Sequence, residues 1–121
     1  MTMENNSKVV NNIEVKIEDK EIAELIGDVC SSTYGVVGLT KVKSLKSQLA
    51  IILNRNNYLE GILLTKEKNK YVVDVHVVMA YGVKISEVVR ELYKGISYNL
   101  NKKYGPIFSK INIYVEELRD L

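Results

Sequence analysis

Two polar side chains within an apolar stretch are the first candidates for catalysis. His76 is the only histidine of the 121 residues, and Asp74 stands two positions before it. Because residues two apart in a strand share one face, the pair has the arrangement of a carboxylate and an imidazole in a general base. However, a histidine beside an aspartate on a strand is more often a structural pair, and no third group to orient the base is evident. We therefore expect no enzymatic activity and no catalytic residues.

The single cysteine, Cys30, is the second candidate for chemistry. A reactive thiol needs a cationic neighbour that lowers its pKa, and no basic residue stands three or four positions from Cys30. It lies at the edge of an apolar stripe, which indicates a small core residue. One cysteine and one histidine exclude a disulfide framework and a cysteine-rich zinc site. No phosphate-loop, zinc-protease, hydrolase or calcium-loop motif is present, so we expect no metal and no cofactor.

Gly35-Val36-Val37-Gly38 matches the Gly-x-x-Gly turn of KH domains, which joins two helices and clamps an RNA backbone. Three lysines just downstream would extend an edge that contacts phosphates or an acidic partner: Lys41, Lys43 and Lys46. An RNA clamp favours basic residues between the glycines, whereas here two valines lead into a predicted strand. The glycines are better explained as a helix cap and a turn. RNA binding is the alternative function, although a net charge of +2 does not favour nucleic acid.

Tyr98 is the candidate residue for a protein interface. It lies about 200° around the predicted helix from Ile96, on the solvent side with Glu91 and Lys94. An exposed tyrosine offers a large contact area with few rotatable bonds. The unpaired edges of an open sheet are a second surface that another chain can cover. We expect a homo-oligomer that also binds another protein.

The composition is that of one ordinary globular domain. The hydrophobic fraction of 46% and the charged fraction of 26% exclude a wholly disordered chain and a membrane-embedded one. The apolar run over 71–83 is interrupted by Asp74 and His76 and is shorter than the roughly 20 residues that span a bilayer. The polar first eight residues differ from a signal peptide. We expect a cytoplasmic protein without direct membrane insertion, with residues 1–10 flexible and 11–121 forming a single domain.

Hydrophobic periodicity predicts the elements that would position these residues. Strands are predicted at 12–17, 36–39, 59–65, 71–80 and 107–115, followed by a polar tail over 116–121. Helices are predicted over 20–33 and from about 83 to 104. The segment 44–54 fits either a buried strand or a helix, and we favour a short helix. Residues 54–57 form a polar linker, and 66–69 a tight turn.

Five residues are predicted to cap helices and to form turns: Gly35, Gly38, Gly82, Gly105 and Pro106. The resulting order is β-α-β-(α)-β-β-α-β. Two main helices on one face of a mixed sheet are the simplest way to bury both apolar stripes and one face of the strands. We therefore predict a two-layer α/β (α+β) fold with about five strands.

Three segments of the chain carry a resemblance to a known family. They are VVDVHVVMAYGVKISEVVREL at 72–92, SKINIYVEEL at 109–118, and the first helix leading into YGVVGL at 34–39. The chain resembles the alkaline shock protein family, the YloU-like envelope stress response proteins of Gram-positive bacteria, from Ile13 to Val115. It departs from that pattern at Tyr93, where many members have glutamine, and at Tyr104, where threonine commonly precedes the glycine.

The resemblance implies a small cytosolic protein without known catalytic residues. Some members gather at the membrane through a partner and tend to self-assemble. A role in cell-envelope homeostasis is also implied. Together with the residues described above, this predicts a non-enzymatic assembly or adaptor protein, located in the cytoplasm and associated with the membrane through a partner.

Overall fold

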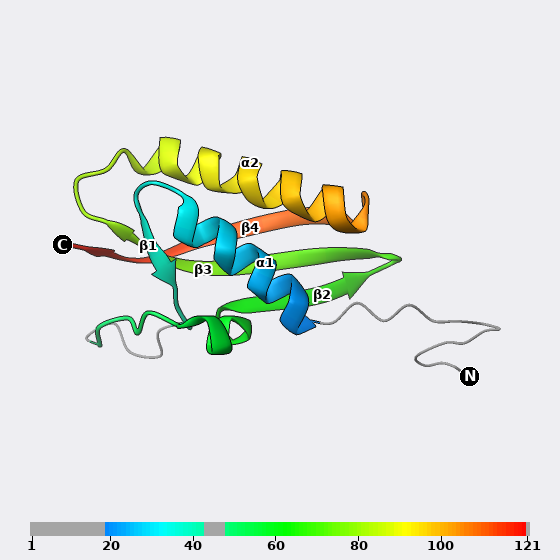
Figure 1. Ribbon diagram of the computed structural model, residues 1–121, viewed down its shortest axis with the longest axis horizontal. Helices are drawn as coiled ribbons and strands as arrows, with labels where there is room; N and C mark the ends of the chain where they lie inside the picture. Colours follow the sequence, from blue (N-terminus) through cyan, green and yellow to red (C-terminus); the bar gives the residue numbers. More distant parts are fainter. Residues whose placement is uncertain (1–18, 43–47, 121) are drawn as a thin grey trace.

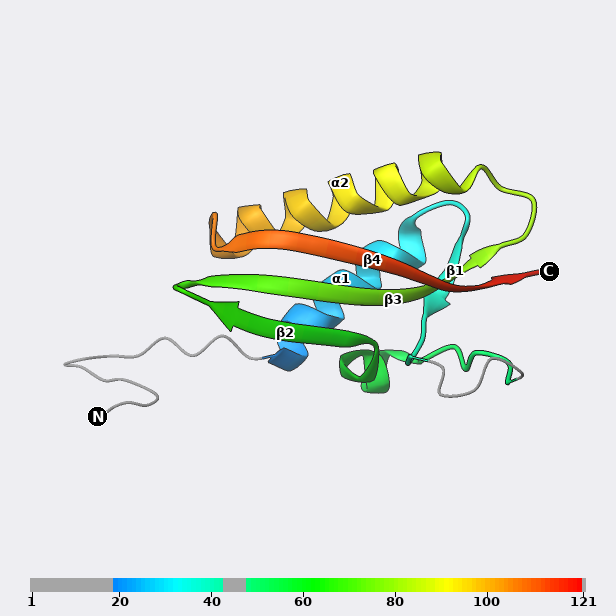
Figure 2. The same cartoon turned by 180° about the vertical axis from the view of Figure 1, so that it is seen from behind.

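The computed structural model describes residues 19–42 and 48–120, in which two helices lie on one face of a sheet (Figure 1). The helices are α1 (Asp19–Ser32) and α2 (Ile85–Tyr104), and a 3-10 helix, η1 (Arg55–Gly61), precedes the second strand. Figure 2 shows the opposite face of the sheet, with α1 behind the strands. The predicted two-layer α+β fold is confirmed. The described residues form four strands instead of about five, and the strand predicted at 12–17 lies outside them.

The strand β3 (Lys70–Ala80) is the centre of the sheet. Two strands pair antiparallel with it along one edge, β2 (Ile62–Glu67) beside 70–75 and β1 (Val36–Leu39) beside 77–79. On the other edge β4 (Phe108–Arg119) pairs parallel with it, and α2 makes the crossover connection that parallel strands need. The sheet is therefore mixed, as predicted.

A two-residue turn joins β2 to β3. Its residues, Lys68 and Asn69, have φ angles of 55° and 90°. Positive φ at both positions is the geometry of a type I′ turn, whose twist matches that of the flanking strands. The predicted tight turn is confirmed, and the strands extend closer to it than the sequence indicated.

The core lies between the helices and the inner face of β3. Alternate β3 residues, from Val73 to Met79, are fully buried against the apolar stripes of both helices. The stripe residues recur at helical spacing along the two predicted helices: Ile22, Ile26, Leu92, Ile96 and Leu100. The two helices approach closely, since a Cβ added at Gly95 would lie 2.9 Å from Cγ1 of Val29.

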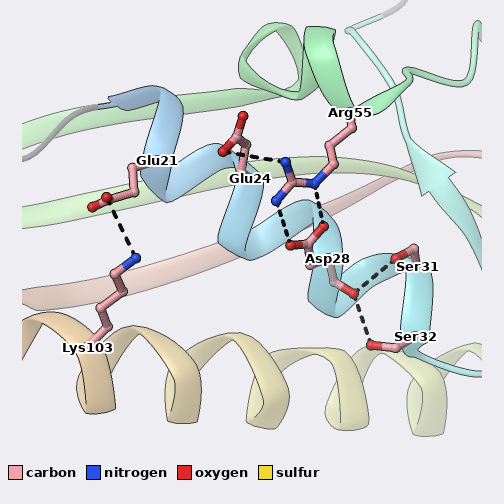
Figure 3. A network of polar contacts seen from close by, with 7 residues as sticks. All are labelled: Glu21, Glu24, Asp28, Ser31, Ser32, Arg55 and Lys103. Carbon is pink, nitrogen blue, oxygen red and sulfur yellow. Dashed lines mark hydrogen bonds and ion pairs between the residues drawn. The ribbon is translucent and has the colours of Figure 1, made fainter.

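Polar contacts fix α1 to the elements around it (Figure 3). The Arg55 guanidinium donates to both carboxylate oxygens of Asp28, at 3.2 and 3.1 Å, and lies 3.7 Å from Glu24. The hydrogen bonds to Asp28 and the charges of both carboxylates raise the pKa of Arg55. At the other end of α1, Lys103 lies 3.7 Å from Glu21. These exposed contacts hold η1 and the end of α2 against α1.

The segment 48–54 is extended, so the predicted short helix over 44–54 is wrong for these residues, while 43–47 lie outside the described residues. Ile52 forms a bridge with Thr40, and the Leu53 amide donates to the Leu39 carbonyl at 2.8 Å. The Ala50 amide donates to Glu117 Oε1 at 2.8 Å, and its carbonyl accepts from Arg119. Bonds to distant strands thus replace those that a helix would form within itself.

Three other boundaries differ from the prediction. The predicted polar tail over 116–121 is wrong, because β4 continues to Arg119 and pairs with β3 along that length. Residues 55–61, predicted as part of a polar linker and the beginning of a strand, instead form η1. Asn54 caps this helix by accepting a hydrogen bond from the Asn56 amide at 3.1 Å. The helix α2 begins at Ile85, two residues later than expected.

Candidate functional site

Asp74 and His76 share the sheet face opposite the helices, but each bonds to β4 and they form no dyad. His76 Nδ1 lies 2.8 Å from Glu116 Oε2, and its ring stacks on Tyr114 with the centroids 4.9 Å apart. Asn112 Nδ2 donates to Asp74 Oδ1 at 2.9 Å. Both polar groups therefore have structural partners, and the β3–β4 pairing places these partners directly beside them.

Cys30 lies on the core-facing side of α1 and is fully buried, as predicted. Burial raises the pKa of its thiol to about 12, because the low-dielectric interior disfavours the thiolate. The thiolate is the nucleophile and the metal ligand, so this cysteine has the properties of a packing residue.

We predict that Cys30 resists alkylation in the folded protein. At pH 8 the native chain is expected to react with iodoacetamide at least about a hundredfold more slowly than the denatured chain, because the folded-state pKa lies far above the pH. Mass spectrometry of quenched time points measures the rates. Stability should also fall as the pH rises above the ordinary thiol pKa near 9, since only the unfolded thiol then ionises. Equal native and denatured rates would contradict the prediction.

The glycines predicted to act as caps and turns divide into two groups. Gly35, Gly82 and Gly105 have φ angles of 91°, 92° and 84°, in the region that favours glycine, and Pro106 follows the last of them. Gly38 instead lies within β1 opposite Val78, so its assignment to a cap or turn is wrong. A Cβ at Gly38 would lie 2.8 Å from Cγ2 of Ile52. Glycine is therefore needed here because the Ile52 side chain lies close to the backbone of β1.

The Gly-x-x-Gly segment does not have the setting of an RNA clamp. It leads from α1 into β1, whereas the KH turn joins two helices. Lys41 lies 3.5 Å from Glu60, which offsets part of its charge. Lys43 and Lys46 lie outside the described residues. The described geometry gives the RNA-binding alternative no specific support.

Tyr98 is 64% exposed on the outer side of α2, in agreement with the helical wheel. Lys102 Nζ lies 5.7 Å from its ring centroid, a cation–π contact typical of an exposed helix face. Glu91 and Lys94, the other two candidates, form an ion pair of 3.8 Å one turn earlier. The exposure of this surface is confirmed, and its role in self-association stays a prediction.

Tyr34 and Tyr81 were not predicted as surface residues, although they are 88% and 69% exposed. Tyr34 lies in the turn before β1 and Tyr81 in the turn after β3, and their neighbours are joined, since the Ala80 amide donates to the Gly35 carbonyl at 2.8 Å. Beside them a groove of about 570 Å³ runs between the end of α1 and the start of α2, lined by Thr33, Tyr34, Val83, Val88 and Glu91 among others. Turn residues follow no hydrophobic period, so only the pairing of the strands reveals this surface.

Two further types of site were sought in the described part of the chain. No group of three or more histidine, cysteine or acidic side chains gathers within 19–42 and 48–120 to hold a metal ion. Among the same residues, neither helix has the combination of length and apolar character that crossing a bilayer demands.

Comparison with known proteins identifies the family. A family model described by a cell envelope-related function matches residues 7–119, which is nearly the whole chain. The chain belongs to the alkaline shock protein family. The resemblance found in the sequence is thereby confirmed, and the family places the chain in a cell envelope-related function.

Two relatives in the alkaline shock protein family come from Gram-positive bacteria, and both are described as uncharacterised. Spy1614 of Streptococcus pyogenes serotype M6 is 30% identical over 105 residues, covering 87% of each chain. YloU of Bacillus subtilis strain 168 is 29% identical over 106 residues, covering 88% of each chain. No solved structure matches the chain significantly.

Proposed function

We propose that this chain is a non-enzymatic assembly or adaptor protein of the cell envelope. One observation carries the proposal: the strongly exposed Tyr34 lines a groove between the two helices, and the exposed Tyr81 directly precedes the groove residue Gly82. Tyrosine contributes a large apolar ring and a polar hydroxyl, so it is enriched in protein interfaces. Two such rings beside a groove are a surface suited to a protein segment.

The settings of the most reactive side chains support a role without catalysis. His76 is held by Glu116 and stacked on Tyr114, and the Cys30 thiol is buried with a raised pKa. A catalytic group needs access to a substrate and a partner that orients it. These two side chains serve the packing of the sheet and of α1.

The link to the envelope in this proposal is a partner protein. The cell envelope-related function of the family agrees with a partner at the envelope, and the groove beside Tyr34 and Tyr81 gives a surface for a segment of a membrane-anchored protein. The chain itself would then remain in the cytoplasm. Exposed apolar area in the groove, from Val83 and the ring of Tyr34, together with the exposed ring of Tyr81, provides the binding free energy when it is covered.

Affinity purification tests the proposal. A tagged chain is cross-linked in its native cell and purified from the membrane fraction, beside Tyr34→Ser/Tyr81→Ser and Tyr98→Ser variants. We expect the wild type and Tyr98→Ser to recover the same envelope protein. The double variant is expected to recover about tenfold less, because it removes two aromatic contacts.

The control variant makes the outcome specific. Tyr98 is also a strongly exposed tyrosine, so it corrects for a general loss of surface aromatics. Recovery of no envelope protein by the wild type would contradict the adaptor role. An undiminished yield with the double variant would show that Tyr34 and Tyr81 do not form the surface that binds the partner.

A further inference from the structure

We infer that the outer edge of β4 and the adjoining flank of α2 form an interface between two copies of this chain. The inference rests on the proposed role in assembly and names the surface that performs it. The second copy adds its own β4 antiparallel to the first, about a two-fold axis near Ile113. The two sheets then become one continuous sheet.

The backbone of β4 has a set of hydrogen-bonding groups that point away from the sheet. The Tyr71 amide donates to the carbonyl of Ile107, just before β4, and the amide of Tyr81, just after β3, donates to the carbonyl of Arg119, so the odd-numbered residues of β3 face β4. In a parallel pair, the residue directly opposite such a position directs its own N–H and C=O to the far side. The β4 residues opposite Val73, Val75 and Val77 are Ile111, Ile113 and Val115. Within the described ranges no strand pairs with that far edge.

The side chains along the same edge are apolar and incompletely covered. Ile111, Ile113 and Val115 pack against the core but stay partly exposed. Beside them, Tyr93 of α2 is 47% exposed. Gly95 faces Val29 of α1, and a position two residues earlier lies about 200° away around the helix, so Tyr93 occupies the flank away from α1. Figures 1 and 2 both place α2 along the β4 side of the sheet.

An antiparallel pairing centred on Ile113 satisfies these groups. Ile113 lies opposite Ile113 of the second copy, and Ile111 opposite Val115, so all three outward-facing residues pair with outward-facing residues. The same register brings Lys110 beside Glu116 of the second copy, twice by symmetry, at the bulge of β4 where Oε2 of Glu116 also contacts His76. Opposite charges on facing positions stabilise such a pair, so the strand is complementary to itself in both hydrogen bonding and charge.

The other free edge of the sheet has the features that prevent pairing. β2 is six residues long, half the 12 residues of β4. Its last residues, Thr65, Lys66 and Glu67, are polar and exposed. Short edge strands with charged side chains are the usual protection against unwanted pairing. The β4 edge lacks this protection over its central residues, which favours it as the contact between copies.

Sedimentation of the full chain across a concentration series tests the inference. The wild type is expected to dimerise, and Ile113→Pro to raise the dimer dissociation constant about tenfold or more, because proline removes an outward N–H at the centre of the pairing. The matched control is Lys66→Pro, whose N–H points outward from the β2 edge, since Lys66 lies opposite the β4-facing residue Tyr71. It should dimerise as the wild type does. Circular dichroism verifies that each variant is folded.

A second variant keeps the test decisive if proline disturbs the strand. Lys110→Glu places a like charge beside Glu116 of the second copy, so we expect the dimer to be severalfold weaker than that of the wild type. This difference in affinity should become smaller in high salt, which screens the repulsion. Unchanged dimers in both Ile113→Pro and Lys110→Glu would overturn this surface while leaving self-assembly intact. A wild type that stays monomeric at high micromolar concentration would also overturn it, and the capture of an envelope partner would then decide the adaptor role separately.

Discussion

Substitution of Gly35 by alanine is expected to destabilise the folded chain by about 3 kcal/mol. Two costs combine at this position. The φ angle of 91° is one that L side chains rarely adopt, and a Cβ would lie 2.8 Å from Cγ2 of Val88. Val88 is itself buried in the core, so it cannot move aside freely. Urea unfolding followed by circular dichroism measures the change in the free energy of unfolding.

Gly82→Ala is the matched control for this prediction. Gly82 has nearly the same φ angle, 92°, but no atom within 4 Å of the added Cβ. Only the cost of the unfavourable φ angle remains, so we expect the free energy of unfolding to fall by about 1 kcal/mol. The difference between the two variants measures the contact with Val88. Equal losses would show that this contact carries no energy.

Gly27→Ala is expected to destabilise the fold by about 2 kcal/mol, although alanine is the better helix former. An added Cβ would lie 2.2, 2.3 and 2.7 Å from three ring atoms of Tyr58. The ring would have to leave its place against α1, and the packing between α1 and η1 would be lost. In an unobstructed helix the same change would instead stabilise by about 1 kcal/mol. The sign of the effect therefore tests the contact.

A double-mutant cycle with Tyr58→Ala isolates this contact. In the Tyr58→Ala background the obstruction is absent, so Gly27→Ala should raise the free energy of unfolding by about 1 kcal/mol. Thermal and urea unfolding of the four proteins supply the cycle. If Gly27→Ala destabilises equally in both backgrounds, the ring of Tyr58 is not the cause.

The parts of the fold that the sequence predicted are those with long, regular periods. Alternation over β3 and the apolar stripe of α2 identified the core residues, from Val73 to Leu100, because both elements bury one continuous face. The helix ends at Gly35 and Gly105 were also predictable, since the positive φ that closes a helix is a local requirement that glycine meets. In these places local pattern and tertiary packing agree.

The parts that it mispredicted depend on distant partners. Ile52 and Leu53 have helical spacing with Leu49, yet their backbone bonds to β1. Glu117 and Arg119 read as a polar tail, because nothing local shows that their side chains reach the backbone of Ala50. A bond between residues 67 or more positions apart leaves no periodic signal.

The candidate surfaces show the same difference between local patterns, which could be predicted, and contacts between distant segments, which could not. Tyr98 was identified because a helix has a calculable solvent side, and it is exposed. Tyr34 and Tyr81 were missed, because they stand in turns, and only the hydrogen bond between their neighbours Gly35 and Ala80 links the two turns. Likewise, the partners of His76 and Asp74 come from β4, 38 or more residues later in the chain.

The central position of β3 has a consequence for the time course of folding and of amide exchange. Its pairing with β2 closes a two-residue turn and can form early, whereas its pairing with β4 must wait for the whole of α2. Once both are formed, β3 has a neighbouring strand on each side. Its amides should therefore exchange with deuterium only through global unfolding, more slowly than those of β2, with whose outer edge no strand of the described residues pairs.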